Sequence, residues 1–195
     1  MLGAALSIRP GDPLFYAASL GVAAVWVAGA LLSGPIRLGR ARTRAGGTSH
    51  PLLHGFLLGA ALLGVFLAGA VVVGRIPVLR EPVDNLLDHA RYGSLLVVVL
   101  ITAIGGASEE LFFRGAVYAA LPSRWNVAGS VGLYAFSTAL SGVPLLTFAA
   151  VCLGLLTALQ RRVTGGVLGP ITSHLTWSLG MLLLLPSALQ FGQPH

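Results

Sequence analysis

The sequence predicts an all-α polytopic membrane protein, a bundle of about six transmembrane helices, and three observations indicate this fold class. Hydrophobic residues make up 55% of the 195-residue chain, charged residues make up 9%, and the mean hydropathy is +0.86. Soluble domains are about half apolar and about a quarter charged. Apolar runs near the ~20 residues that a bilayer requires recur along the chain. We therefore expect a single transmembrane domain over residues 1–195.

The first half of the chain supplies two spans and a polar connection. The first span is expected over residues 14–32, and four arginines follow it in a loop that contains glycine and serine. The second is expected over residues 52–74, where regularly spaced glycines offer surfaces for close helix packing. Residues 75–91 are the most polar stretch. Pro77 and Pro82 predict a loop there that holds a short interfacial helix.

The second half supplies four more spans. The third, over residues 93–121, carries an acidic cluster in its second half. A turn with the interfacial Trp125 follows, and a shorter span is expected over residues 127–140. The fifth covers residues 145–160, closed by a pair of arginines, and the sixth covers residues 167–185, ended by a proline.

A net charge of +6 is compatible with nucleic-acid binding. The positions of the arginines argue against this function. All twelve basic residues are arginine, and they lie mostly in gaps between apolar runs, where the positive-inside rule places them. One predicted side of the membrane holds Arg37, Arg40, Arg42, Arg44, Arg124, Arg161 and Arg162. The other holds Arg9, Arg75, Arg80 and Arg91, partly offset by acids. We expect the first side to be cytoplasmic and both termini to be external.

Two adjacent glutamates and an arginine stand out in the third span. Ionisable side chains at bilayer depth are costly, and they are functional by default. Glu110 and Arg114 are four residues apart, so on a helix they lie on one face, with the acid in the favourable N-terminal position. Glu109 is turned about 100° away from that pair. The spacing therefore predicts a structural ion pair and one separate carboxylate, suited to general acid or base chemistry.

A second polar cluster lies in the last span. His174 and Ser178 are again four residues apart and share a helix face. An imidazole there can stabilise an oxyanion, ligate a metal, or make an interhelical hydrogen bond. Taken alone, either cluster could have only a structural role, as a polar contact between helices. Two such clusters on different spans favour one shared site.

The order of these residues resembles the CAAX protease and bacteriocin-processing family, also called the CPBP or ABI family. Residues 107–116, Ala-Ser-Glu-Glu-Leu-Phe-Phe-Arg-Gly-Ala, are similar to its first motif, and residues 154–174 resemble the approach to its last motif. The similarity covers about residues 93–186, which we expect to be the protease-like core. It implies an intramembrane endopeptidase in which Glu109 helps to activate a water. It also implies that Glu110 and Arg114 support the site, and that His174 and Ser178 stabilise the tetrahedral intermediate.

Metal dependence is not decided by the motifs. Proteins of the family that this chain resembles are often described as metalloproteases. A divalent metal such as zinc, held by Glu109 and His174, is therefore one open alternative. The chain contains no His-Glu-x-x-His signature.

The chain departs from the family pattern at two positions. The family's middle motif is Phe-x-x-x-His, and its best match here begins at Phe136 and puts Leu140 where histidine belongs. The last motif has serine, Ser178, in place of asparagine or aspartate. A missing general base is worth about 10²–10⁴-fold in rate, so Leu140 predicts a weakened site. His54, on the second span, is an alternative occupant of the vacant position.

We therefore expect a glutamate/histidine intramembrane endopeptidase in the inner or plasma membrane of a prokaryote. Its partners would be membrane lipid and a peptide or membrane-protein substrate, with no nucleic acid. The alternative is an inactive scaffold or immunity protein that binds another membrane protein or a peptide. A small transporter with a Glu/His proton relay is a third class, less favoured because no internal repeat is evident. The oligomeric state is not predicted.

Overall fold

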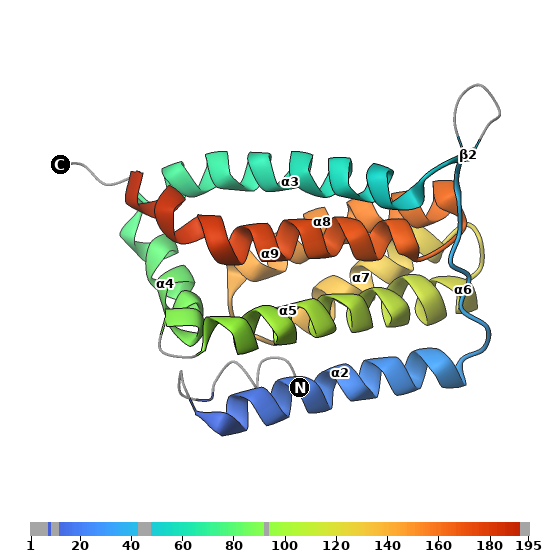
Figure 1. Cartoon of the computed structure of the whole chain (residues 1–195), viewed down its shortest axis with the longest axis horizontal. Helices are drawn as coiled ribbons and strands as arrows, with labels where there is room; N and C mark the ends of the chain where they lie inside the picture. Colours follow the sequence, from blue (N-terminus) through green and yellow to red (C-terminus); the bar gives the residue numbers. More distant parts are fainter. Residues whose placement is uncertain (1–7, 9–11, 43–47, 92–93, 192–195) are drawn as a thin grey trace.

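The computed structural model describes residues 8, 12–42, 48–91 and 94–191. Arg9, Arg44 and the expected start of the third span at Gly93 lie outside the described residues. Within them the chain is helical apart from its connections and one hairpin, in which β1 (Ala41–Arg42) pairs antiparallel with β2 (Thr48–Ser49). The predicted all-α bundle is confirmed, and its long helices lie side by side with their axes roughly aligned (Figure 1).

Six helical segments correspond to the six expected spans. They are α2 (Pro13–Leu32), α3 (Pro51–Val73), a continuous helix from α5 (Leu95–Glu110) through the π-helix η1 (Leu111–Val117) to α6 (Tyr118–Ala120), α7 (Asn126–Ala139), α8 (Pro144–Thr164) and α9 (Leu168–Phe191). Five of them are long and apolar enough to cross a membrane. The exception, α7, has 14 residues. Such a helix is only about 21 Å long, shorter than a hydrocarbon core of about 30 Å.

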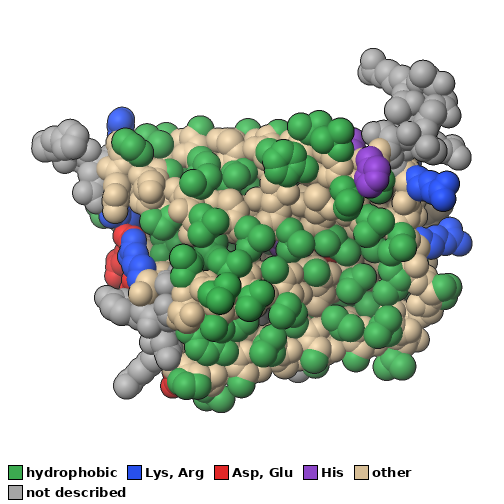
Figure 2. Space-filling model, in the orientation of Figure 1, with side chains coloured by type: hydrophobic (Ala, Val, Ile, Leu, Met, Phe, Trp, Pro, Cys, Tyr) green, Lys and Arg blue, Asp and Glu red, His purple; other side chains and the backbone are tan. Residues whose placement is uncertain are grey.

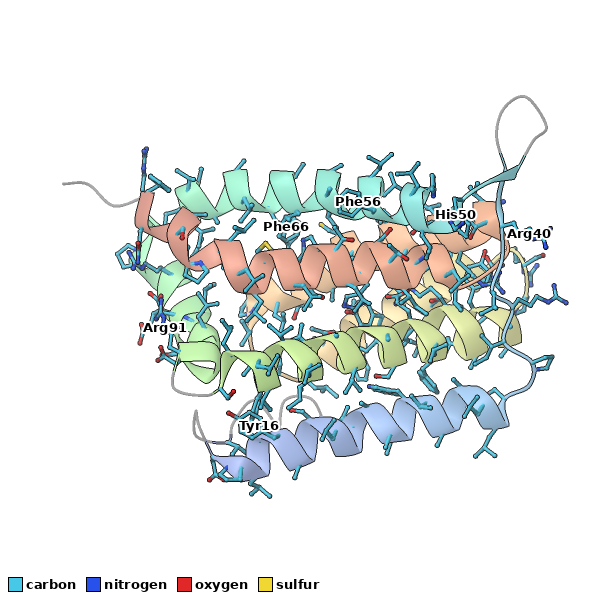
Figure 3. The ribbon with its side chains drawn as sticks, in the orientation of Figure 1. Tyr16, Arg40, His50, Phe56, Phe66 and Arg91 are labelled. Carbon is cyan, nitrogen blue, oxygen red and sulfur yellow. The ribbon has the colours of Figure 1, made fainter. Side chains whose placement is uncertain are left out.

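Charged residues gather at the two ends of the bundle (Figure 2). We call one end, formed by residues 33–42, 48–50, 121–125 and 165–167, the arginine end. It has no acidic residue, because the six acids of the chain are Asp12, Glu81, Asp84, Asp88, Glu109 and Glu110. We call the opposite end, which holds α4, the mixed-charge end. Figure 3 shows Arg40 at the first end and Arg91 at the second. The predicted grouping of loop arginines by side therefore matches the helix directions.

The polar stretch between α3 and α5 is more ordered than expected. It forms one helix, α4 (Pro77–Arg91), which lies across the mixed-charge end in Figure 1. Pro77 occupies the first helical position, where its missing N–H removes no helical hydrogen bond. Val83 and Leu87 are buried against Ala70 and Leu189. The predicted loop with a short helix was therefore wrong in length, because an amphipathic face packs on the bundle.

The outer surface of the spans is apolar, and polar side chains are turned inward. Phe56 on α3 projects away from the bundle (Figure 3), whereas Thr157 and Ser173 are buried. Close packing of α3 on α9 requires glycine: a Cβ at Gly59 would lie 2.5 Å from the carbonyl oxygen of Ser173. This packing fixes the position of α9, which carries His174.

Candidate active site

The centre of the bundle contains a fully buried ion pair. Glu110 and Arg114 are both 0% exposed, and Arg114 Nε lies 3.3 Å from Glu110 Oε2. Arg114 Nη2 also donates a hydrogen bond to the Gly154 carbonyl of α8 at 3.0 Å. A buried charge without a partner costs several kcal/mol, so each member of the pair depends on the other. The pair ties the helix of α5 and η1 to α8.

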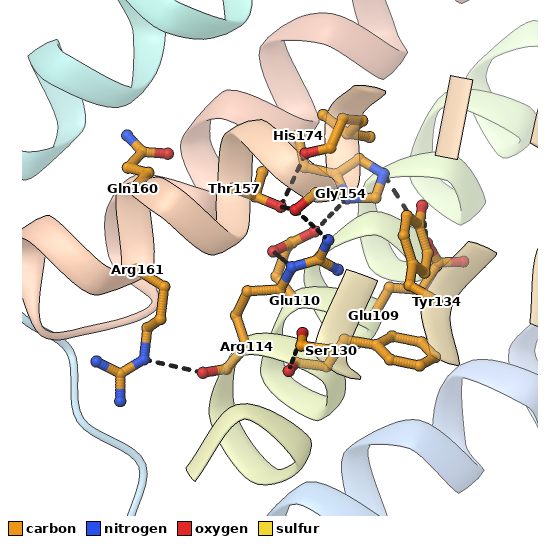
Figure 4. Close-up of polar contacts among 12 residues, drawn as sticks. Glu109, Glu110, Arg114, Ser130, Tyr134, Gly154, Thr157, Gln160, Arg161 and His174 are labelled. Carbon is orange, nitrogen blue, oxygen red and sulfur yellow. Dashed lines mark hydrogen bonds and ion pairs between the residues drawn. The ribbon is translucent and has the colours of Figure 1, made fainter. Parts of the chain in front are cut away.

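The imidazole of His174 lies between the two adjacent glutamates. Its Nδ1 is 2.9 Å from Glu110 Oε1, and its Nε2 is 4.0 Å from Glu109 Oε2. A carboxylate beside Arg114 accepts hydrogen bonds, so the Nδ1 of His174 carries the hydrogen in this contact. The ring packs directly on α5, because a Cβ at Gly106 would lie 3.2 Å from His174 Cδ2. The mid-chain acids and the late histidine therefore meet inside the bundle (Figure 4).

Tyr134 of α7 completes the cluster, and we did not predict it. Its hydroxyl donates a hydrogen bond to Glu109 Oε2 at 2.8 Å, and its ring lies 4.6 Å from the Arg114 guanidinium carbon. A signal was present in the sequence: Ser130, Tyr134 and Thr138 recur every four residues and form one polar face. All three are buried.

The helix changes from α to π immediately after Glu110. In η1 the Tyr118 N–H bonds to the Phe113 carbonyl, which leaves the Arg114 carbonyl without its usual helical donor. Arg161 Nε of α8 donates to that carbonyl at 2.9 Å. Arg161, predicted only as a loop-side charge, therefore supports the helix that carries the glutamates.

Two residues near His174 have donors without partners. Ser178 Oγ and Trp177 Nε1 are buried and have no hydrogen-bond partner among the described residues. Ser178 thus makes no hydrogen bond to the glutamates, although it follows His174 by one helical turn. His54 bonds elsewhere: its Nδ1 is 3.1 Å from Gln160 Nε2.

The predicted match of Phe136 and Leu140 to the middle motif does not face this cluster. Phe136 is 66% exposed, and Leu140 is 61% exposed at the C-terminal end of α7. Leu140 follows Tyr134 by six residues, about 9 Å along the helix and about 240° around it. Thr138, one turn after Tyr134 on the same face, is buried. Thr138 therefore shares the buried face of Tyr134, whereas Leu140 does not.

The donors present do not fit a zinc site. A catalytic zinc ion has three protein ligands. No group of three His, Cys, Asp or Glu residues in the described parts of the chain has a geometry that could hold a metal ion. Glu109 and His174 supply two donors, and one side of His174 is already bonded to Glu110.

One comparison with known proteins matches the part of the chain that contains the site. Residues 91–180, which include every member of the cluster, match a family model described as type II CAAX prenyl endopeptidase Rce1-like. Neither the curated proteins nor the solved structures give a significant match to the chain. The predicted resemblance to the CAAX protease family is confirmed by the family-model match, which covers slightly less than half of the chain.

Proposed function

We propose that the protein is an intramembrane endopeptidase that hydrolyses a peptide bond with glutamate and histidine side chains. The observation that carries the proposal is the His174 ring between two carboxylates, 2.9 Å from Glu110 and 4.0 Å from Glu109. The first distance is a hydrogen bond, which orients the ring. The second is too long for one and suits a bridging water.

Hydrolysis at this site proceeds in two steps. Glu109 takes a proton from the bridging water while the water oxygen adds to the peptide carbonyl carbon, and protonated His174 donates through Nε2 to the resulting oxyanion. Glu109 then returns the proton to the amide nitrogen as the C–N bond breaks, and His174 Nε2 takes its proton back from one of the two hydroxyls, which releases a carboxylic acid and an amine and restores both side chains. Glu110 stabilises the imidazolium, and Arg114 neutralises Glu110.

The remaining residues position these groups. Tyr134 holds Glu109 through its 2.8 Å hydrogen bond, so it sets the direction of the carboxylate. The unpaired hydroxyl of Ser178 is available to a substrate carbonyl, which fits a supporting role for the tetrahedral intermediate. No step requires a metal.

The test is peptide cleavage by purified protein in lipid nanodiscs. The probe is a fluorogenic peptide with a prenylated Cys-aliphatic-aliphatic-X terminus, alongside its unprenylated form. Glu109→Gln is expected to lower cleavage by about 10²–10⁴-fold with an unchanged thermal unfolding midpoint. Glu81→Gln makes the same chemical change on the exposed face of α4 and should cleave like the wild type. Equal cleavage by Glu109→Gln and wild type would refute the role of Glu109.

A scaffold or immunity function is the second candidate, and one observation favours it. The α7 residue that contacts Glu109 is Tyr134, and α7 contains no histidine to share a water with that glutamate. A scaffold would cleave neither probe peptide, and its partner binding would be insensitive to Glu109→Gln. We place either function in the inner membrane of a prokaryote, with the arginine end in the cytoplasm.

A further inference from the structure

A cavity at the arginine end lies beside the helix that carries the glutamates but outside the cluster itself. Its volume is about 420 Å³, within the range of small-ligand sites. Segments from four regions form its wall: the end of α2 with the residues after it, the η1–α6 helix with the turn that follows it, the start of α7, and Arg161 of α8. Neither Glu109 nor His174 lines it.

The cavity wall is cationic and has no acidic side chain. Arg37 and Arg161 both line it, with Ser123 and Asn126 as further polar groups. The backbone of Arg37 is anchored, because its carbonyl accepts a hydrogen bond from the Val167 N–H at 3.0 Å. No carboxylate can neutralise this pair locally, since all six acids of the chain lie elsewhere.

Arg161 is the unusual member of this wall, because it is only 8% exposed. Its Nε bonds to the Arg114 carbonyl, and its guanidinium carbon lies 5.3 Å from the centre of the Tyr118 ring. Among the described residues the only hydrogen bond of its side chain is made by Nε, so its two terminal nitrogens have no protein partner. A largely buried guanidinium therefore presents unpaired donors to the cavity, which is the arrangement that binds phosphate.

The start of α7 adds partial positive charge to the cavity wall. The helix begins at Asn126 in the cavity wall, and no side chain caps it. The first N–H groups of a helix have no helical acceptors and carry partial positive charge, which favours an anion. The apolar end of α2 runs past the same opening, where Leu31 and Leu32 are exposed. A phosphate and an acyl chain on one molecule would match both features.

We propose that this cavity binds the phosphate of an anionic phospholipid headgroup, held by Arg37, Arg161 and the N-terminus of α7, with the acyl chains along α2. The site lies at an end of the bundle, as a headgroup requires. Arg161 also bonds to the Arg114 carbonyl, so a phosphate that holds Arg161 in place would also stabilise η1. The proposal needs no peptidase activity.

The experiment measures the thermal unfolding midpoint and lipid affinity of the purified full chain in detergent. The added probes are dihexanoyl phosphatidylglycerol, dihexanoyl phosphatidylcholine and inorganic phosphate. Phosphatidylglycerol is expected to raise the midpoint in a saturable way, and the other two are expected to have little effect. An equal rise with inorganic phosphate would overturn the assignment to a lipid, and no response to phosphatidylglycerol would overturn the site.

Single arginine substitutions locate the binding. Arg37→Gln and Arg161→Gln are each expected to weaken phosphatidylglycerol binding about fivefold, the effect of one cation near an anionic headgroup. Arg162→Gln removes the same charge from an exposed neighbour of Arg161 and should change affinity less than twofold. If Arg161→Gln does not fold, Arg37→Gln carries the test, because its backbone contact remains. Equal weakening by Arg37→Gln and Arg162→Gln would indicate diffuse attraction and overturn the site.

Discussion

Carboxylates pair with arginines in two regions of this molecule, and the pairs differ in how far they are buried within the protein. In the central cluster, Glu110 and Arg114 are fully buried and reach partners on α8 and α9. In α4, Asp84 accepts hydrogen bonds from Arg80 and Arg91, whose side chains belong to the same helix and are partly exposed. Carboxylate–arginine pairs therefore connect different helices in the central cluster, whereas in α4 they join residues of a single helix. Burial and long-range partners, more than residue type, distinguish a site from a charged surface.

The largest predicted effect is the loss of the buried counter-charge. Arg114→Gln leaves Glu110 without its cation, which should destabilise the fold by about 3–5 kcal/mol. Arg91→Gln, its counterpart in α4, should cost at most about 1 kcal/mol because that pair is exposed to solvent. Thermal unfolding in one detergent compares the two. Equal losses would remove the distinction drawn between the regions.

A second test asks which α7 position faces the cluster. Thr138→His adds an imidazole on the face of Tyr134, and we expect peptide cleavage to rise about 100-fold, the lower range for general-base assistance. Leu140→His adds the same group at an exposed position and should leave the rate unchanged. The comparison is made on the fluorogenic peptide in nanodiscs. A gain with Leu140→His alone would show that the chosen face of α7 is wrong.

The positioning of Glu109 gives a smaller effect. Tyr134→Phe removes the hydroxyl that donates to Glu109 Oε2 but keeps the ring beside Arg114. Because hydrogen bonds to charged groups are worth about 1.5–3 kcal/mol, cleavage should fall by about tenfold or more. The decline should appear in kcat, with KM nearly constant. A change in KM alone would place Tyr134 in substrate binding instead.

The smallest predicted effect concerns pH and α4. Burial acts to raise the pKa of Asp84, but hydrogen bonds and charge attraction from Arg80 and Arg91 outweigh it, so the pKa lies below its usual value of 3.8. The ion pairs thus stabilise α4 above about pH 4, and this contribution is lost as the pH falls through the lowered pKa. The free energy of opening of α4, measured by hydrogen exchange, should fall by less than about 1 kcal/mol over this pH range. Asp84→Asn should remove the pH dependence, and a stability gain on acidification would contradict this sign.

Much of the fold could be predicted because membrane spans depend on local composition. The apolar runs located the helices, and the four-residue spacing of Glu110 and Arg114 predicted their ion pair. The predicted end of the last span at Pro186 was wrong, because Pro186 lies inside α9, which continues to Phe191. The segment over 75–91 was harder, because its helix is stabilised by packing of Val83 and Leu87 on distant residues. Tyr134 was not predicted, because its contact with Glu109 depends on how α7 packs beside α5, although Ser130, Tyr134 and Thr138 recur every four residues along α7.

What the sequence determined by itself was the set of membrane helices and the identity of the ionisable residues within them, since both follow from hydropathy and helical spacing. Only the tertiary structure decided which carboxylate contacts which nitrogen of His174. It also decided that Tyr134 bonds to Glu109 and that Arg161 bonds to the Arg114 carbonyl. Those contacts link residues 25 to 64 positions apart. They depend on the rotation and depth of neighbouring helices, which no local pattern encodes.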